Sequence, residues 1–172
     1  MPHEEASTKR QGPRVSVARQ VIERITEHAR AEWPNECCGL ILGTDERIDE
    51  AVPARNLQAS SSRFLVDPAD HLAAVRRARA TGRRVVGAYH SHPNTPPVPS
   101  PRDLEEASYT EFVYLICGPV WQHDQGPIAV RAWRLASEPP ALACPPEREA
   151  RTWNVGSTGF VEVQLVVIGE NA

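Results

Sequence analysis

The sequence predicts an α/β (α+β) protein in which a mixed β-sheet is flanked by helices. Short apolar or β-branched runs alternate along the chain with amphipathic segments of helical period, which is typical of this class. The chain has 172 residues, which is the size of one domain with little room for a second. Because 41% of the residues are hydrophobic and 24% are charged, one globular core can be buried and wholesale disorder is excluded.

The first regular element expected is an amphipathic helix. Residues 1–13 are polar and contain proline and glycine, so we expect a flexible tail ahead of a single domain over 14–172. Apolar residues then recur at helical spacing with charges between them, which predicts a helix from about Val17 to Trp33. Pro34 ends this helix, because its ring disfavours the helical conformation at the preceding residue.

Three strands are expected next. Residues 38–43 form a short apolar run bounded by turn residues, which is typical of a buried strand. Residues 48–57 predict a second strand, and Pro53 places it at a sheet edge or a bulge, because proline cannot donate to the ladder. Residues 62–66 predict a third strand.

A second helix is expected after Asp67-Pro68, a dipeptide that supplies an N-cap and a proline for the first turn. The strongest central strand follows at 84–89. Residues 93–101 contain five prolines, which excludes regular structure there. Further expected elements are a short helix opened by Ser100, strands at 112–117, 128–135 and 160–168, and a polar, Pro-rich insertion at about 136–159.

Charge and composition exclude several classes of function. The net charge of −3, from 19 basic and 22 acidic residues, argues against nucleic-acid binding through bulk charge. No apolar stretch is long enough to cross a membrane and no secretion signal is recognised, so a cytoplasmic protein without membrane association is expected. The four cysteines include no Cys-x-x-Cys pair, which argues for buried reduced thiols rather than disulfides. His28 is expected at the surface.

The segment from His90 to Asp103 carries the candidate chemistry. His90 and His92 lie two apart at the end of a predicted strand, so both imidazoles point to the same side. Asp103 lies in the first turn of the next helix and can turn its carboxylate toward them. Two imidazoles and one carboxylate suit Zn²⁺ and leave a fourth tetrahedral position for water, as in catalytic sites. A zinc ion there lowers the pKa of water from about 15.7 to about 7.

Two further residues complete the candidate site. Glu36 precedes a strand expected to neighbour the histidine strand, and it is the candidate that takes a proton from water and gives it to the leaving amine. The alternative is a solvated loop acid. Ser100 can serve as the N-cap of the short helix, as a hydrogen-bond donor to an oxyanion, or as both.

These residues resemble the JAMM (MPN+) metalloprotease motif. Glu36 is followed by His90-Ser91-His92-Pro93; seven residues separate His92 from Ser100, and two more separate Ser100 from Asp103. The flanking segments 38–43 and 86–93 resemble the family as well. The similarity covers about residues 15–135, together with 160–168.

The resemblance implies a cytidine-deaminase-like JAB/MPN fold. It assigns one zinc ion to His90, His92 and Asp103, the general base to Glu36 and oxyanion support to Ser100. The implied reaction is hydrolysis of a peptide or isopeptide bond at the C-terminus of a ubiquitin-like protein. The short chain favours the compact prokaryotic branch, which acts on small sulfur-carrier proteins with Gly-Gly tails.

Three alternatives stay open from the sequence. The first is a non-catalytic scaffold of the same fold that binds protein partners, and the second is a DNA-repair-associated relative with a similar histidine loop. The third is a site of this motif that has lost its metal. The sequence identifies neither the carrier nor the leaving group, which can be cysteine, a short peptide or a lysine-linked protein. It also leaves the oligomeric state open, a homodimer included.

Overall fold

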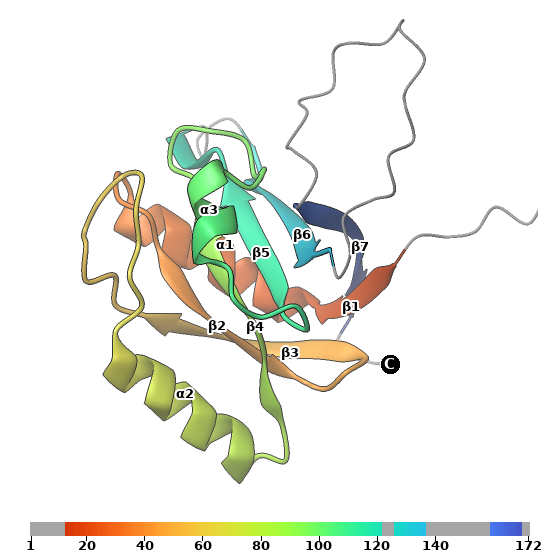
Figure 1. Ribbon diagram of the computed structural model, residues 1–172. Helices are drawn as coiled ribbons and strands as arrows, with labels where there is room; N and C mark the ends of the chain where they lie inside the picture. The colour runs from red at the N-terminus through yellow and green to blue at the C-terminus, as the bar shows by residue number, and fades with distance from the viewer. Residues whose placement is uncertain (1–12, 122–125, 137–158, 170–172) are drawn as a thin grey trace, which may run out of the picture.

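The computed structural model describes residues 13–121, 126–136 and 159–169. In this part of the chain, a strongly curved mixed sheet closes on itself and is accompanied by three helices (Figure 1). The elements are β1 (Arg14–Ala18), α1 (Arg19–Glu32), β2 (Cys38–Gly43), β3 (Arg47–Ala54), α2 (Pro68–Ala80), β4 (Arg84–Ser91), α3 (Pro101–Glu106), β5 (Val113–Gly118), β6 (Ala129–Leu135) and β7 (Phe160–Ile168).

The sheet order is β1-β3-β2-β4-β5-β6-β7, and β7 pairs back with β1 to close the barrel. The β1–β3, β1–β7 and β4–β5 pairs are parallel, while the others are antiparallel. The mixed α/β class expected from the sequence is therefore confirmed. Closure of the sheet was not predicted, because it depends on pairing between the two ends of the chain.

The N-terminal expectation was wrong over its first residues. The helix begins at Arg19, and Arg14–Ala18 forms β1 instead. Val17 fits both patterns, because it continues the helical spacing of Val21 and also alternates with Val15 along a strand. The strand wins because β7 and β3 pair with it, and neither of these partners is visible from the local sequence.

The region after β3 also differs from expectation. β3 ends at Ala54, and the strand expected at 62–66 was wrong: only a single bridge joins Asn56 to Val66. Residues 57–65 between the paired ends form a loop, called the strap here. Pro53 does occupy an edge position, because β3 pairs with β1 only at Arg47 and Ile48 and with β2 along the rest of its length.

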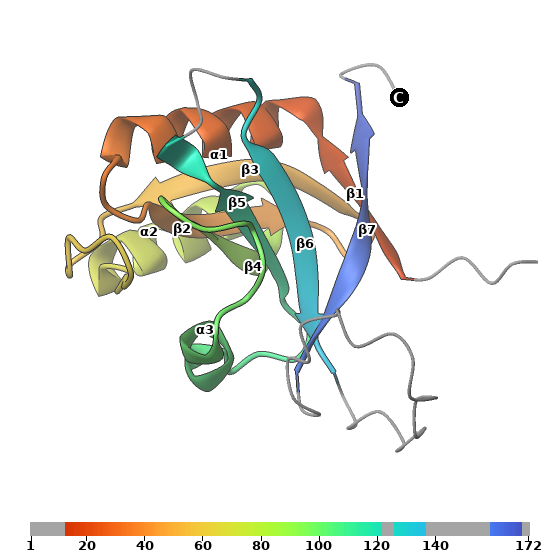
Figure 2. The same cartoon turned by 90° about the horizontal axis from the view of Figure 1, so that it is seen from above.

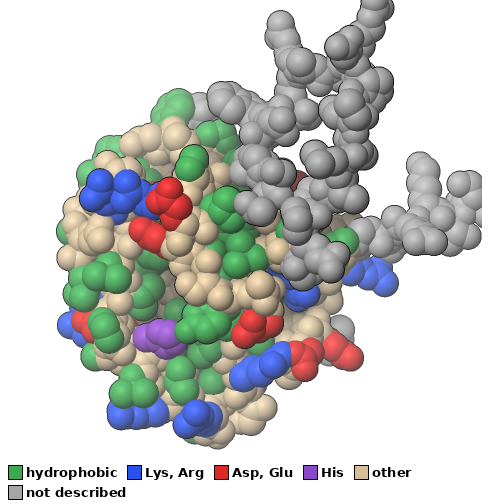
Figure 3. Space-filling model, viewed as in Figure 1, with side chains coloured by type: hydrophobic (Ala, Val, Ile, Leu, Met, Phe, Trp, Pro, Cys, Tyr) green, Lys and Arg blue, Asp and Glu red, His purple; other side chains and the backbone are tan. Residues whose placement is uncertain are grey.

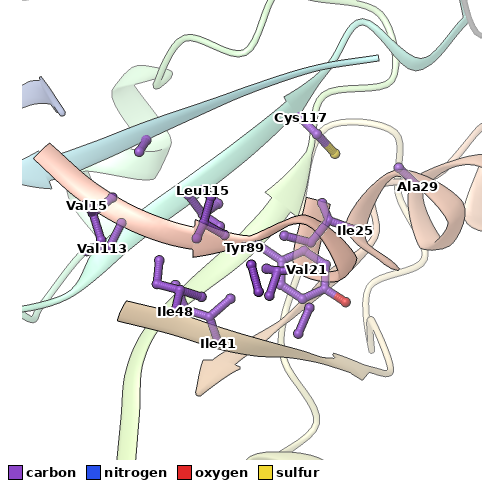
Figure 4. Close-up of a cluster of buried hydrophobic side chains, with 14 of the residues drawn as sticks. Val15, Val21, Ile25, Ala29, Ile41, Ile48, Tyr89, Val113, Leu115 and Cys117 are labelled. Carbon is purple, nitrogen blue, oxygen red and sulfur yellow. The ribbon is translucent and has the colours of Figure 1, made fainter. Parts of the chain in front are cut away.

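Two groups of buried side chains hold the fold together. The larger group lies between α1 and one face of the sheet and includes Ile25, Ile41 and Leu115 (Figure 4). A smaller group, with Leu40 and Ala78, fixes α2 against the opposite face of β2 and β4. Figure 2 shows α1 and α3 on opposite sides of the sheet. Successive residues of β2 and β4 therefore face different layers.

Several expectations about single residues can be compared with the structure. Cys37, Cys38 and Cys117 are buried free thiols, as expected. The surface position expected for His28 was wrong: its side chain is 13% exposed, and its Nδ1 is hydrogen-bonded to the Tyr89 hydroxyl at 2.9 Å. No helix within the described ranges is long and apolar enough to cross a membrane. Residues 1–12 and 137–158, which hold nearly all of the expected tail and insertion, lie outside the described residues.

Candidate metal centre

The backbone pairing of β2 and β4 positions two of the site elements. Cys38 lies opposite His90 in the antiparallel ladder, and the Ser91 N–H donates to the Cys37 carbonyl at 3.1 Å. Continuing this register places Glu36 opposite His92. Because residues opposite each other share a face of a sheet, Glu36 and both imidazoles lie on the face that does not point into the main core.

The short helix α3 supplies the third polar group. Ser100 is its N-cap: the Ser100 Oγ accepts from the Asp103 N–H at 3.2 Å, and the Ser100 N–H donates to Asp103 Oδ2 at 2.6 Å. This reciprocal capping box fixes the Asp103 carboxylate on the first turn. The capping role expected for Ser100 is therefore present. Among the described residues no hydrogen bond joins its hydroxyl to either histidine, so the oxyanion role stays a prediction.

Three side chains converge. The Nε2 atoms of His90 and His92 are 3.1 Å apart, and the Asp103 carboxylate oxygens lie 3.2 Å from the first and 3.4 Å from the second. All three candidate ligand atoms lie within 4.8 Å of one another, and both histidines are buried. Burial opposes ionisation of Asp103, but its hydrogen bonds with His90 and His92 hold the pKa of the carboxyl well below its usual range.

Neighbouring groups fix the orientation of each imidazole. The Nδ1 atom of His92 lies 2.9 Å from the Pro96 carbonyl oxygen, so Nδ1 carries the proton and Nε2 offers its lone pair. Burial lowers the pKa of His92, but the bonds to Asp103 and Pro96 together raise it above its ordinary value. On the other side, the ring of Phe64 stacks on His90, with centroids 4.7 Å apart and 23° between the planes. The sequence analysis identified neither Pro96 nor Phe64, since neither belongs to a metal-binding motif.

The Pro-rich loop between β4 and α3 is tied to the sheet. The His92 N–H donates to the Cys117 carbonyl at 2.7 Å, and the Trp133 Nε1–H donates to the Pro97 carbonyl at 3.1 Å. Gly118 lets the end of β5 approach this loop, because a Cβ at that position would lie 2.6 Å from the His92 carbonyl oxygen. The loop thus holds its histidine and its helix start in a fixed relation.

Glu36 is buried beside the three converging groups, with 6% of its surface exposed. Burial raises the pKa of its carboxyl to about 7, opposed by the charge of His92 and supported by the charges of Asp103, Cys37 and Glu106. A carboxyl with a pKa near neutrality suits proton transfer in both directions. As expected, β2, the strand that follows Glu36, pairs with β4, the histidine strand.

A groove of about 620 Å³ opens beside the three groups. His90 and Asp103 form one end of it, the strap forms one wall, and α3 with the segment before β5 forms the other. Figure 3 shows hydrophobic side chains gathered on this face between α2 and α3. The aromatic and large aliphatic residues along the groove are Leu40, Phe64, Leu65, Tyr109, Phe112, Tyr114, Ile116 and Phe160.

The donor set fits a metal ion of the zinc class. Two imidazole nitrogens face each other at 3.1 Å, which is favourable for two lone pairs only when a proton or a cation lies between them. The carboxylate adds the negative charge that such a cation requires, and two nitrogens with one oxygen match the ligand set of catalytic zinc. His90, His92 and Asp103 are the only group of three metal-ligand side chains found among the described residues.

Comparisons with known proteins agree with this geometry. Residues 18–136 match the family model described as prokaryotic homologs of the JAB domain. A desampylase from Haloferax volcanii is 37% identical over 113 residues, covering 62% of this chain and 81% of that protein. A probable TtuB-protein conjugate cleaving protease from Thermus thermophilus is 35% identical over 103 residues, covering 59% and 68%. A solution structure from Desulfitobacterium hafniense superposes with a TM-score of 0.71 at 27% identity, covering 91% of this chain and 94% of that one.

Proposed function

The chain belongs to the family of prokaryotic homologs of the JAB domain, and from this premise we propose that it is a zinc-dependent peptidase. The proposed reaction is hydrolysis of the bond after the C-terminal Gly-Gly tail of a small ubiquitin-like or sulfur-carrier protein. The observation that carries the proposal is the convergence of His90, His92 and Asp103 within 4.8 Å at the end of an apolar groove. The similarity to a conjugate-cleaving protease supports the class of substrate.

In this proposal His90, His92 and Asp103 hold one Zn²⁺ per chain. When bound, the ion polarises the scissile carbonyl and makes water acidic enough to ionise near neutral pH. Glu36 accepts the proton of the attacking water and delivers it to the departing nitrogen, a role that its pKa of about 7 favours in both directions. Ser100 donates a hydrogen bond to the oxygen that gains negative charge.

The groove provides the path for the carrier's tail. Both edges of β4 are already paired, with β2 and β5, so an extended tail cannot add directly to the histidine strand. The strap forms one wall of the groove, and we place the extended tail along this wall. Glycines next to the cut site let the tail approach His90 and Asp103 closely, because they carry no side chain.

Three different leaving groups are compatible with this function, and each defines a different substrate. The name of the Thermus thermophilus relative favours a lysine-linked protein, and we adopt that isopeptide as the first substrate to test. A carrier extended by a short peptide and a carrier with a C-terminal cysteine are the other two. The net charge of −3 does not favour the DNA-repair-associated alternative, and a salt-dependent DNA-binding measurement tests it.

Intact-mass analysis tests the proposal. Gly-Gly-tailed carriers with each of the three leaving groups are incubated with the zinc-loaded protein, with and without a chelator. The expected result is loss of the leaving group's mass, abolished by the chelator and restored by added Zn²⁺. Cleavage that is indifferent to the chelator would contradict the zinc mechanism. Carrier binding without cleavage of any of the three would instead support the non-catalytic scaffold.

A further inference from the structure

The side chain of Asn56, which follows β3, uses its full hydrogen-bonding capacity. Its amide nitrogen donates to the Glu36 carbonyl and to the Arg63 carbonyl, each at 3.0 Å. Its amide oxygen accepts from the Gln58 N–H and the Leu65 N–H, each also at 3.0 Å. Two donors and two acceptors are all that an asparagine amide offers. Aspartate would not replace it, since it would bring a carboxylate oxygen to two carbonyl groups.

The first of these contacts holds the main chain of the proposed base. The Glu36 carbonyl accepts from Asn56, and the Glu36 N–H donates to the Ser60 carbonyl at 2.8 Å. Both polar main-chain groups of this residue are thus bound to the strap or to its anchor. The Glu36 carboxylate has no hydrogen-bond partner in the described part of the chain. Its place beside His92 is therefore set by its main chain and by packing.

The other contacts hold Phe64. The carbonyl before it, on Arg63, and the N–H after it, on Leu65, both bond to the Asn56 amide. Phe64 in turn stacks on His90 and lines the groove. A single side chain therefore connects the proposed base on one side with the aromatic support of a proposed metal ligand on the other.

We propose that Asn56 is a positioning residue of this centre, which keeps Glu36 and the Phe64–His90 stack in the arrangement that proton transfer requires. This inference rests on the proposed hydrolytic function. Asn56 acts through Glu36 and contacts neither the ion nor the scissile bond. Losing its amide lets the base shift while the three ligand side chains stay in place, so turnover falls and zinc is retained.

A double-mutant cycle tests the proposal. The rates of Asn56→Ala are measured in the wild-type background and in the Glu36→Gln background, on zinc-loaded protein with a cleavable carrier. In the wild-type background we expect kcat to fall by about 10- to 100-fold, more than KM rises, because misplacing a reacting group by about 1 Å has effects of this size. In the Glu36→Gln background we expect less than about a threefold further loss, because the proton-transferring group is already absent and only the Phe64–His90 contact is left to be disturbed.

Thr81→Ala is the matched control. The Thr81 hydroxyl donates to the Arg77 and Ala78 carbonyls at the end of α2, at 3.0 and 3.1 Å, so this variant also loses side-chain hydrogen bonds to the main chain. It should lower the melting temperature and leave kcat unchanged. Asn56→Ser keeps a small polar side chain that is too short to bridge all four partners, and it replaces Asn56→Ala in the cycle if the alanine variant does not fold.

Failure of the proposed function and failure of the positioning role give different experimental results. A wild-type protein that cleaves nothing under zinc overturns the proposed function itself. An active wild-type protein in which the Asn56 variants lose the same factor in both backgrounds overturns the positioning role, because a general structural effect does not depend on Glu36. An unchanged kcat in Asn56→Ala overturns it too, as does loss of zinc from that variant.

Discussion

Neighbouring residues at the end of β4, and His92 directly after it, face two different environments at the same depth. Tyr89 and Ser91 point into the core and are 1% and 0% exposed, while His90 and His92 lie on the face of the candidate metal centre and are 5% and 6% exposed. On the core face each polar atom has its own partner: the Tyr89 hydroxyl pairs with His28, and the Ser91 Oγ accepts from a main-chain N–H. On the groove face the polar atoms converge on one another instead. The direction of the buried polar atoms, and not burial itself, marks the candidate site.

Removing one member of the convergent group should have the largest effect. We expect His92→Ala to abolish zinc binding and cleavage together, because two remaining ligands do not hold the ion and the imidazole is a direct donor. The melting temperature of the metal-free protein should change by only a few degrees. Zinc stoichiometry by elemental analysis and a carrier-cleavage assay measure both effects. Retention of one zinc per chain would remove His92 from the ligand set.

Substitution of Ser91, the adjacent residue on the core face, provides the contrast to His92→Ala. Ser91→Ala removes the acceptor of the buried Cys37 N–H, whose 2.8 Å bond is lost. An unsatisfied buried donor costs about 1–3 kcal/mol of unfolding free energy. We expect this variant to keep full zinc occupancy and most of its activity while losing stability in denaturant titration. If Ser91→Ala lost zinc as completely as His92→Ala, the distinction between the two faces would not hold.

Substitution of the proposed base should come next in size. Glu36→Gln keeps the shape of the side chain but cannot accept the proton of water, and proton transfer contributes about 10²- to 10⁴-fold in rate. We therefore expect turnover to fall by that factor at unchanged zinc stoichiometry. Steady-state kinetics with paired metal analysis measure it. Wild-type turnover in this variant would exclude Glu36 from the reaction.

Substitution of Ser100 distinguishes a role in stabilising the oxyanion from a role in capping α3. If its hydroxyl serves both, Ser100→Ala should lower kcat by up to about 10²- to 10³-fold, the range found for loss of an oxyanion donor. Loss of the N-cap alone should lower the unfolding free energy by about 1 kcal/mol and leave kcat nearly unchanged. Comparing kcat with the unfolding midpoint decides between them, and a loss confined to stability would leave Ser100 with capping alone.

The burial of Glu36 should also appear as a pH-dependent stability difference. Its pKa is about 7 in the folded metal-free protein, above the value of 4.5 that it has in an unfolded chain. Below pH 4.5 the group is protonated in both states and has no effect; above pH 7 it must be ionised while buried, which destabilises the fold by about 1–3 kcal/mol. Metal-free Glu36→Gln should therefore be more stable than wild type at pH 8 and equal to it at pH 4.5. A stability difference that does not change with pH would contradict the raised pKa.

Elements with a clear local pattern and elements that depend on distant partners differed in how far the sequence could predict them. Strands such as Cys38–Gly43 and Phe160–Ile168 have the expected bounds, because the first is a short apolar run that ends at turn residues and the second is β-branched and alternating. β1 was missed because its valines also fit a helix and its partner β7 lies at the other end of the chain. The strand expected at 62–66 was wrong because its β-like composition serves a loop that is fixed by Asn56.

The candidate site followed the same division. The spacing of His90, His92 and Asp103 predicted their convergence, because a strand and a helix start have fixed geometry. The groups that support them were not predictable. Phe64 comes from the strap and Asn56 directly precedes it, and the path of this loop depends on hydrogen bonds between residues without regular spacing. Pro96 acts through its main-chain oxygen, which any residue has.

X-ray absorption at the zinc edge, measured on the purified zinc-loaded protein, tests the central claim most directly. The account predicts one zinc per chain with two imidazole nitrogens at about 2.0–2.1 Å, one carboxylate oxygen and one exchangeable oxygen from solvent, and it predicts loss of this spectrum in His92→Ala but not in Ser91→Ala. Sulfur in the first coordination shell, or a fourth ligand from the protein that closes the site, would contradict it.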